Sequence, residues 1–353
     1  MSSRQQEWLN TFCRPCAPDE GEAFGRPDET DDAVFYAADR FVSHLDRTAL
    51  ETVERIIGEL VVEEHPVILD LMAGWDSHIP ASIVPSEAAG LGLNPNELER
   101  NATLTVRVRH DLNQDPHLPF PDNYFDVALN TVSVDYLTKP LDVFGEVGRV
   151  LKPGGLFLVI FSNRMFPKKA VNIWRRSSED ERVLMVEDYF RESGAFEAAV
   201  SFRSKGLPRP SDDKYAEYGL PSDPIFAVYA EKKGGSPERK PRPGLNPVYG
   251  EPLSPAELAA RKSRIKHDAR CPYCGEKLRK WAVPDNPFGQ TWDNDLMLIC
   301  FNDNCPYFVR GWSVISKTVG RSSSYRLMYN PEKDCCLPIP APTPKALRES
   351  IID

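Results

Sequence analysis

The sequence predicts an α/β protein whose first domain is a doubly wound, mostly parallel sheet of seven strands and whose second domain is small. Three observations lead to this prediction. Short apolar runs alternate with segments of helical periodicity as far as residue 230. A stretch rich in Pro, Gly, Lys and Arg then interrupts the alternation, and two cysteine pairs follow it. Strands that alternate with helices of this length form βαβ units, and such units build parallel sheets.

Length and composition narrow the class of protein. The chain has 353 residues, which suits two domains rather than one. Its net charge of −9 argues against a protein that binds nucleic acid over its whole surface. No apolar run approaches the roughly 18 residues that predict a membrane span, and the N-terminal residues lack the apolar core of a signal peptide. We therefore expect a soluble, cytoplasmic protein without membrane association.

The first elements precede the sheet. Residues 1–32 are polar and acidic, and we expect them to form a flexible arm. Over residues 46–60 apolar side chains recur at helical spacing, and Asp46 or Thr48 is placed to cap the start of the helix. The spaced apolar residues are Leu50, Val53, Ile56, Ile57 and Leu60.

The sheet domain is expected to cover residues 33–231. Its strands are predicted at seven short apolar runs, residues 66–71, 88–93, 104–108, 125–129, 156–161, 198–202 and 225–229. Helices are predicted at residues 96–101, 141–151 and 178–191. The first run is apolar at nearly every position, which suits a parallel strand that is covered on both faces.

The composition changes after Ala230. Residues 232–253 are rich in Pro, Gly and basic residues, cannot bury a core, and are interpreted as a linker. A helix over residues 255–266 and the cysteine-containing segment should form a small domain, residues 254–330. Residues 331–353 carry several prolines and are expected to be an extended tail.

Two strings in the sheet domain carry a recognisable pattern. Pro-Phe-Pro-Asp-Asn-Tyr-Phe-Asp-Val-Ala at residues 119–128 enters a buried strand, whose carboxyl end should open on the crevice where ligands of open α/β sheets bind. Phe-Gly-Glu-Val-Gly-Arg-Val-Leu-Lys-Pro-Gly-Gly at residues 144–155 ends a helix in a turn before the next strand. Within it, Glu146 and Arg149 can pair along the helix. Together the strings resemble class I S-adenosylmethionine-dependent methyltransferases of the type 11 branch.

The resemblance covers residues 35–230 and implies a Rossmann-like methyltransferase fold that binds S-adenosylmethionine. In that family the first strand ends in an acidic residue and leads into a turn with three alternating glycines. Asp70 and Gly74 match this pattern, whereas Met72 and Asp76 occupy the outer glycine positions. Side chains at these positions should partly block the close approach of the cofactor.

The resemblance also implies the other cofactor contacts. The second strand of the family ends in a carboxylate that binds the ribose hydroxyls, and here the alignment places Gly92 or, if it slides, Asn94 at that position. Only Asn94 could hydrogen-bond a hydroxyl. Asp111 and Leu112 match the adenine-side motif, and Asn130 follows the predicted fourth strand, where the family often has a small polar residue near the methionine moiety.

Two explanations fit the altered turn. Either it binds S-adenosylmethionine through different contacts, or the fold serves another purpose. The turn is similar to that of a small group of methyltransferase-like proteins, in which an aliphatic-Asp strand runs into a Trp-containing loop with Ser-His. That group also carries a block with Phe35, Arg40, His44 and Asp46, which favours a coherent variant site.

Methyl transfer needs a nucleophile aligned with the sulfonium methyl group and, for some acceptors, a residue that takes a proton. The candidates for contact with the acceptor are Tyr36, His44, His78 and Tyr136. Each also has a purely structural interpretation, since Tyr36 could simply close over the sheet and His44 could be a capping or core histidine. The sequence does not identify the methyl acceptor.

The second domain carries two cysteine pairs, Cys271 with Cys274 and Cys300 with Cys305. Two thiols in a tight turn can face one ion, and two such turns complete a tetrahedral thiolate site. The opening Cys-Pro-Tyr-Cys-Gly is similar to zinc ribbons and small phage-type zinc fingers, so we expect a structural Zn²⁺. Four thiolates leave no open position for catalysis, and iron–sulfur ligation or unligated thiols are the alternatives.

Four cysteines and a basic segment remain. We expect Cys13, Cys16, Cys335 and Cys336 to be reduced thiols. The basic side chains near the cysteine pairs are Arg261, Lys262, Arg264, Lys266, Arg270, Lys277, Arg279 and Lys280. They could bind nucleic-acid phosphates or a protein, with Trp281 stacking on a base. A solvated helix face is the alternative that we favour.

Two functional hypotheses follow. The first is an S-adenosylmethionine-dependent methyltransferase whose zinc ribbon is structural or recruits a macromolecular substrate. The second is a non-catalytic adaptor in which a degenerate methyltransferase fold and a ribbon present binding surfaces. Asp70, Gly74 and Asp111 favour the enzyme, whereas the lost glycines and the lost ribose carboxylate favour the adaptor.

Overall fold

The computed structural model describes residues 23–205, 207, 209–216, 222–245, 248–249, 253–284, 294–303, 305–319, 323–343 and 345–352. The chain divides into two compact units, residues 1–246 and residues 247–353. Cys13 and Cys16 lie outside the described residues. Among the described residues, no helix combines the length and the apolar run needed to cross a membrane.

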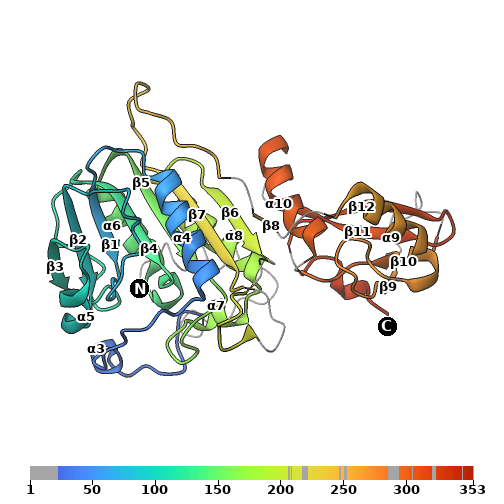
Figure 1. The fold of residues 1–353 in the computed structure, drawn as a ribbon, viewed down its shortest axis with the longest axis horizontal. Coiled ribbons are helices and arrows are strands. Elements are labelled where there is room, and N and C mark those ends of the chain that lie inside the picture. Colours follow the sequence, from blue (N-terminus) through green and yellow to red (C-terminus); the bar gives the residue numbers. More distant parts are fainter. Residues whose placement is uncertain are drawn as a thin grey trace. The chain divides into compact units, whose positions relative to one another are not determined.

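The first unit contains the predicted sheet (Figure 1). Its strands are β1 (Val67–Leu71), β2 (Glu87–Gly92), β3 (Val106–Arg109), β4 (Phe125–Thr131), β5 (Leu151–Phe161), β6 (Val200–Lys205) and β7 (Ile225–Glu231). Within the first unit they follow the order β3-β2-β1-β4-β5-β7-β6, and β7 runs antiparallel to both β5 and β6. The expectation of a mostly parallel seven-stranded sheet is therefore confirmed.

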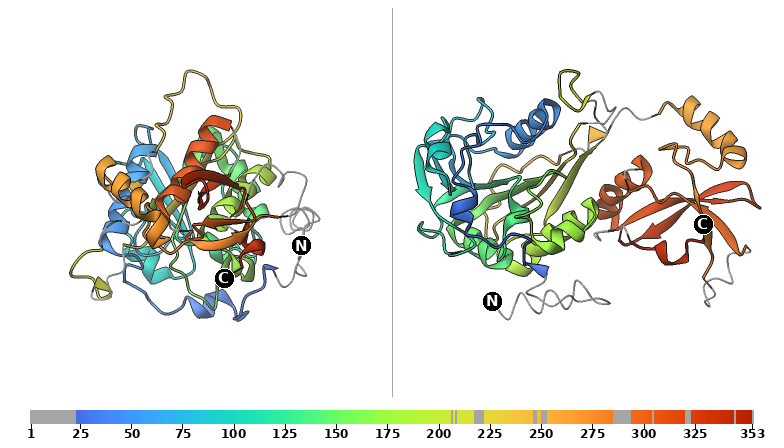
Figure 2. Two further views of the ribbon diagram at one scale, coloured as in Figure 1. Left: turned by 90° about the vertical axis from the view of Figure 1, so that its right-hand side faces the viewer. Right: turned by 90° about the horizontal axis from the view of Figure 1, so that it is seen from below.

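Helices cover both faces of this sheet. They are α3 (Asp32–Phe35), α4 (Arg47–Leu60), α5 (Pro95–Arg100), α6 (Pro140–Val150), α7 (Asn172–Arg176) and α8 (Glu179–Ser193), with a 3-10 turn η1 (Val134–Tyr136). Helix α4 starts where the sequence predicts, because the Asp46 side chain accepts a hydrogen bond from the backbone of Ala49. Figure 2 shows α4 on one face of the sheet and α8 on the other.

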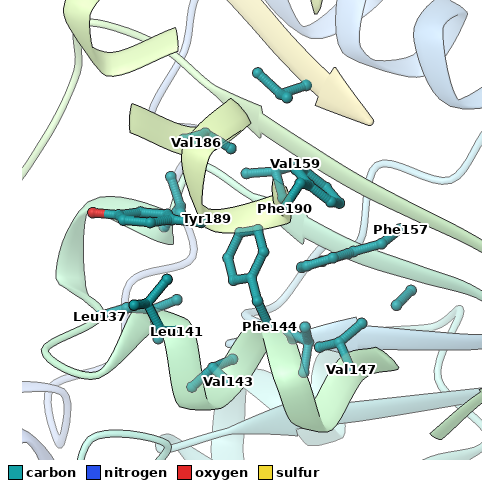
Figure 3. Packing of buried hydrophobic residues seen from close by; sticks show 14 of the residues in the cluster. Leu137, Leu141, Val143, Phe144, Val147, Phe157, Val159, Val186, Tyr189 and Phe190 are labelled. Atoms are coloured by element: carbon teal, nitrogen blue, oxygen red, sulfur yellow. The ribbon is translucent and has the colours of Figure 1, made fainter. Parts of the chain in front are cut away.

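The core beneath α6 and α8 is aromatic. The ring of Phe144 lies 4.8 Å from the ring of Phe157 and 5.0 Å from that of Phe190, measured between centroids and with edge-to-face geometry (Figure 3). Such contacts add to the gain from burying the ring area. They hold α6 and α8 against β5, which fixes the neighbouring strand β4 and the loop that follows it.

The connection from β1 to β2 differs from an ordinary βαβ crossover, because residues 72–86 contain no helix. The chain instead stays close to β2, where the backbone N–H of Ala73 donates to the carbonyl of Leu91 at 2.6 Å. Gly92 has no room for a side chain, since a Cβ there would lie 2.3 Å from the carbonyl oxygen of Ala73. The close approach of these two segments fixes the turn after β1.

The boundaries of the first domain differ from the expected ones at both ends. Within the expected flexible arm, Ala23 and Phe24 are buried in the central core, and Arg26 forms an ion pair with Asp32 at 2.7 Å. Within the expected linker, Arg242 is nearly buried and pairs with Glu63 and Glu231. Both segments are polar in composition, but their apolar and charged side chains find partners on the folded domain.

The second unit contains a four-stranded antiparallel sheet. The elements of this unit are β8 (Val248–Tyr249), α9 (Pro255–Asp268), β9 (Arg279–Ala282), β10 (Leu296–Ile299), α10 (Pro306–Val319), β11 (Ser324–Asn330), β12 (Cys335–Ala341) and a 3-10 turn η4 (Arg348–Ser350). The sheet order is β12-β11-β10-β9. Trp281, Met297, Ile299, Met328 and Ile339 form its small core.

The expected extended tail, residues 331–353, is part of this unit. Strand β12 pairs with β11 along its length, and Ile351 forms a bridge with Trp281. Pro338 and Pro340 lie on the edge strand, where a missing backbone donor costs no internal hydrogen bond. The prolines suggested a free tail because composition does not reveal a pairing partner that is distant in the sequence.

The close approach at Gly92 leads to a stability prediction. Gly92→Ala should lower the free energy of unfolding by about 1–3 kcal/mol, because the added methyl group meets a backbone carbonyl that cannot move without disturbing the turn. Gly145→Ala is the matched control: it lies within α6 with open space around it, and it should stabilise by about 0.5–1 kcal/mol. Urea denaturation of both variants measures the difference, and equal stabilities would contradict the close approach.

Candidate functional site

A cavity opens at the carboxyl ends of β1, β2 and β4, the edge where ligands of doubly wound sheets bind. It holds about 1200 Å³ of empty space, its open mouth included. The sequence-predicted residues that line it are Tyr36, His44, Asp70, Gly74, His78, Asn94, Asp111, Leu112 and Tyr136. Asn130 is buried at the end of β4 and is not among the residues that line the cavity. One site thus brings together nearly all residues that the resemblance implied.

The altered turn keeps a glycine-like backbone. Met72 has a φ of 57°, in the left-handed region that glycine adopts without cost. His78 and Val132, which also line the cavity, have φ values of 53° and 47°. Val132 is β-branched, so this conformation is costly for it. The side chain of Met72 packs against the central core as well as lining the cavity, so it narrows the space beside Gly74 only in part.

The missing helix after β1 explains why the outer glycine position at residue 76 can carry a side chain. In dinucleotide-binding folds one glycine of this turn lets the following helix pack closely on the strand. Here residues 72–86 form an irregular loop, and no helix needs that space. Asn101 fastens the loop instead, since its amide donates to the carbonyl of Gly74 at 3.0 Å and to the hydroxyl of Ser77 at 2.9 Å.

Asp70 ends β1 as a buried carboxyl group. Burial raises its pKa to about 7, against the opposing effect of a hydrogen bond from Ser77. The nearby imidazole of His78 also favours the charged form, and Asp76 disfavours it. A carboxyl group that titrates near neutral pH is poised to ionise fully when a cation comes beside it.

Neither sequence-predicted ribose residue is available. Gly92 has no room for a side chain, as described above. The amide nitrogen of Asn94 donates to the carbonyl of Tyr36 at 3.1 Å and to Asp39 at 2.9 Å, while its oxygen caps α5. Asn94 therefore holds the segment that contains Tyr36 and Asp39 against α5. The sequence alone suggested a ligand role because a capping amide and a ligand-binding amide have the same residue type.

Glu97 is a cavity residue that sequence reasoning missed. It lies in the first turn of α5, and Oε1 accepts a hydrogen bond from the backbone of Arg40 at 2.8 Å. Its Oε2 lies 3.4 Å from the position that a Cβ on Gly74 would take. Burial raises the pKa of this carboxyl group, against the hydrogen bond from Arg40. The available signal was a carboxylate three residues after a capping asparagine, at the end of β2.

The turn after β3 forms another wall of the cavity. Leu112 is buried, and the Asp111 carboxylate accepts a hydrogen bond from the backbone of Asn113 at 2.9 Å. The side-chain amide nitrogen of Asn113 donates to the Asp32 carboxylate at 2.9 Å, and this hydrogen bond ties the turn to α3. Asp111 therefore stabilises its own turn, and it presents Leu112 as an apolar surface.

Several buried hydroxyls at the cavity have no partner among the residues that the structure describes. They belong to Tyr36, Thr131 and Ser133. Both amide atoms of Asn130 are also unpaired. A buried polar group without a hydrogen bond costs about 1–3 kcal/mol, so such a group implies a ligand or water that pairs with it. The unpaired atoms of Asn130, Thr131 and Ser133 lie at the carboxyl end of β4.

The remaining catalytic candidates differ in what they can do. Burial raises the pKa of Tyr36 and of Tyr136 above the usual tyrosine range, so neither hydroxyl is readily deprotonated. The Tyr136 hydroxyl also accepts a hydrogen bond from the backbone of Phe166 at 2.8 Å. Burial lowers the pKa of His44, whose ring lies 5.4 Å from that of Phe166. Together these rings form an aromatic wall beside the polar end of the cavity.

The two predicted cysteine pairs of the second unit come together. One ligand atom from each of Cys271, Cys274, Cys300 and Cys305 lies within 4.8 Å of the others. Gly275 has a φ of 76° and donates to the carbonyl of Cys271 at 2.8 Å, which closes the first turn. The cluster is compatible with a tetrahedral thiolate metal site.

The basic surface of the second unit is separate from its aromatic core. Trp281 is buried and donates its indole N–H to the carbonyl of Leu347 at 2.8 Å, so it cannot stack on a base. Helix α9 buries only Ile265, and Arg261, Lys262, Arg264 and Lys266 are exposed. The predicted stacking of Trp281 on a base is therefore wrong, and the exposed basic side chains of α9 fit a solvated helix face.

The buried Asp70 gives a pH-dependent prediction. An unfolded aspartate ionises near pH 4 and Asp70 in the fold near pH 7, so wild-type stability falls as the pH rises between these values. Asp70→Asn cannot ionise, and its advantage over wild type should grow through this window to at most roughly 4 kcal/mol at about pH 8. Urea denaturation at both ends of the window measures it, and a difference that does not change with pH would contradict the burial of an ionisable Asp70.

Sequence comparison identifies a methyltransferase segment. Residues 76–159 match the family model described as "Methyltransferase domain". A fatty-acid O-methyltransferase of Mycolicibacterium smegmatis is 32% identical over 121 residues, which are 32% of this chain and 41% of that protein. The ubiquinone/menaquinone biosynthesis C-methyltransferase UbiE of Stutzerimonas stutzeri is 47% identical over 55 residues, 14% of this chain and 22% of that protein. The chain thus spans less than half of the length of these curated relatives.

A solved structure is also similar to this chain. The S-adenosylmethionine-dependent methyltransferase of Mesorhizobium loti is 18% identical, covers 52% of this chain and 98% of its own, and has a TM-score of 0.35. The family match lies within the first unit and covers β2, β3, β4 and most of β5, and it thus includes two of the three strands whose ends form the cavity. The matched segment and the order of the strands together support a class I methyltransferase domain in this chain.

Proposed function

We propose that this protein is an S-adenosylmethionine-dependent methyltransferase and that a structural zinc ion holds its second unit together. The observation that carries the proposal is the cavity at the carboxyl ends of β1, β2 and β4, which encloses a buried carboxyl group and three unpaired hydroxyls. A ligand with several polar groups would offset the cost of burying them. The methionine and ribose parts of S-adenosylmethionine carry such groups, and its adenine ring is largely apolar.

The residues present fit the three parts of this cofactor. Asp70, Thr131 and Ser133 offer a carboxylate and two hydroxyls to the amino-acid part. Glu97 offers the carboxylate for the ribose hydroxyls that Gly92 and Asn94 do not supply, and Leu112 offers an apolar surface to the adenine. When bound, S-adenosylmethionine supplies an electrophilic methyl group on a sulfonium. The protein's part is to position the acceptor and, where needed, to take its proton.

Backbone strain at the cavity supports a ligand site over the adaptor alternative. Met72, His78 and Val132 all line the cavity with positive φ values. Each such residue costs of order 1 kcal/mol, and strain of this kind clusters at binding and catalytic sites. A fold retained only for its outer surfaces has no use for strain at this edge of the sheet.

The aromatic wall suggests an acceptor with an apolar body. Tyr36, Tyr136 and Phe166 lie within 6.5 Å of one another between ring centroids, and His44 joins them. The relatives described above are named for a fatty acid and for quinones, both of which have long apolar parts. We infer that the acceptor of this protein binds with its apolar part against these rings.

Calorimetry with S-adenosylhomocysteine tests cofactor binding. Wild type should bind, and Glu97→Gln should weaken binding about 10-fold or more, because a charge-assisted hydrogen bond contributes about 1.5–3 kcal/mol. Glu99→Gln is the matched control: it lies two residues away on α5, is exposed, and should bind as wild type does. Absence of binding by wild type would favour the adaptor, and equal binding by Glu97→Gln would remove Glu97 from the site.

Metal analysis tests the zinc proposal. The purified protein should contain one equivalent of zinc, since four thiolates at these distances suit one tetrahedral ion. Cys271→Ser should lose the metal and destabilise the second unit, whose small core cannot replace that energy. Cys335→Ser, outside the cluster, should keep the metal. Iron with visible absorbance in the wild type would point instead to an iron–sulfur centre, and metal retained by Cys271→Ser would exclude this site.

A further inference from the structure

The altered turn brings a carboxylate and a histidine together at the cavity. Asp76 Oδ1 accepts a hydrogen bond from the backbone N–H of His78 at 2.9 Å, and Asp76 Oδ2 lies 3.2 Å from Nδ1 of the same residue. The two oxygens thus fix both the backbone and the ring. Because Nδ1 faces a carboxylate, it carries the proton of the neutral ring, and the lone pair lies on Nε2.

The backbone of His78 is held in a costly conformation. Its φ of 53° lies in the left-handed region, its side chain is only 15% exposed, and the residue lines the cavity. Asp76 stands at an outer glycine position of the family pattern, which this chain does not need for helix packing. The carboxylate at this position therefore has a role that glycine could not perform, which is to orient His78.

The charged and titratable groups that face His78 come from two parts of the fold. Asp70 and Asp76 come from β1 and the following loop, and both stabilise a positive imidazole. His44, with Arg40 beside it, comes from the segment before α4 and opposes that charge. The hydrogen bond from His78 lowers the pKa of the Asp76 carboxyl, so Asp76 is ionised at neutral pH. The positive charge that the ring gains when a proton binds at Nε2 is thus compensated by the Asp76 carboxylate at Nδ1.

The chain contains a second Asp-X-His turn that serves as a comparison. Asp115 Oδ1 accepts from the backbone of His117 at 3.0 Å, as Asp76 does from His78. The ring of His117, however, pairs with Glu146 and is 67% exposed, and the described cavity does not include it. The backbone turn is therefore a local motif that occurs twice, whereas the orientation of the ring by the same aspartate occurs only at the cavity.

We propose that His78 is the catalytic base of the methyl transfer, that Asp76 is its positioning residue, and that the acceptor is a neutral nucleophile that carries an O–H or N–H proton. The proposal rests on the methyltransferase function proposed above. In the step, a lone pair on the acceptor oxygen or nitrogen forms the bond to the methyl carbon. The carbon–sulfur bond breaks with its electron pair remaining on sulfur. The acceptor proton passes to Nε2 of His78, and it leaves to water after product release.

The ring state of His78 can be measured without an acceptor. Long-range nitrogen NMR of ¹⁵N-histidine-labelled full-length protein distinguishes the two neutral tautomers, and His78→Gln assigns the signal. Wild-type His78 should carry its proton on Nδ1, and Asp76→Ala should lose this preference. Asp115→Ala should leave the His78 signal unchanged, because it removes only the equivalent turn at His117. A wild-type ring protonated on Nε2 would overturn the proposal.

Methyl transfer to three probes separates a base from a structural histidine. The probes are 4-octylphenol and 4-octylaniline, which carry a proton, and octanoate, which is already ionised. His78→Gln should bind S-adenosylhomocysteine as wild type does and lower kcat for the two proton-carrying probes by about 100-fold or more. Transfer to octanoate should fall much less, because this probe has no proton to lose, and exogenous imidazole should partly restore His78→Gly on the phenol.

The outcomes distinguish this proposal from the one on which it rests. If wild type does not bind S-adenosylhomocysteine, the proposed function itself fails. If it binds but methylates neither proton-carrying probe, or if His78→Gln lowers transfer to all three probes equally, His78 is not the base. Loss of S-adenosylhomocysteine binding in His78→Gln would likewise assign the residue to the cofactor pocket rather than to proton transfer.

Discussion

The fold around the cavity depends on the contact between the turn after β1 and the end of β2. Ala73 donates to Leu91 at 2.6 Å, and Gly92 accommodates that approach because it has no side chain. Asn101 then ties the carbonyl of Gly74 to Ser77. These contacts replace the helix that would ordinarily follow β1. They hold a loop of fifteen residues, 72–86, rigidly enough to line a binding site.

Because the turn after β1 lies against β2, acidic side chains occupy other positions than in the family pattern. A side chain at the end of β2 would collide with the turn, and the fold instead provides a carboxylate from Glu97, in the first turn of α5. The absence of a helix after β1 frees position 76 for an aspartate that contacts His78. The missing carboxylate at the end of β2 thus follows from the close approach of the turn, and the aspartate at position 76 is possible because no helix follows β1.

The secondary structure of the first unit was largely predictable, because apolar periodicity and capping residues are local signals. Asp46 caps α4 as expected, and every predicted strand is present, with ends shifted by a few residues except at β5, which begins earlier. The domain limits were not predictable in the same way. Phe24, Arg242 and Ile339 lie in segments of polar or proline-rich composition. Phe24 and Ile339 are buried, and the side chain of Arg242 is nearly buried, by partners that are distant in the sequence.

The sequence by itself determined the class of fold, the cysteine cluster and nine of the residues that line the cavity. These features could be predicted because periodicity, cysteine spacing and the motifs of the family resemblance are all local patterns. Only the tertiary structure decided what those residues do. Asn94 and Trp281 are residue types that often contact ligands, yet here their side-chain N–H groups donate hydrogen bonds to backbone carbonyls of other segments. Glu97 became a candidate, and Asp76 a partner of the candidate His78, only when the fold placed these residues at the cavity. The role of a polar side chain depends on whether its hydrogen-bonding groups still lack a partner after folding. Segments that are distant in the sequence determine this, because they supply the partners.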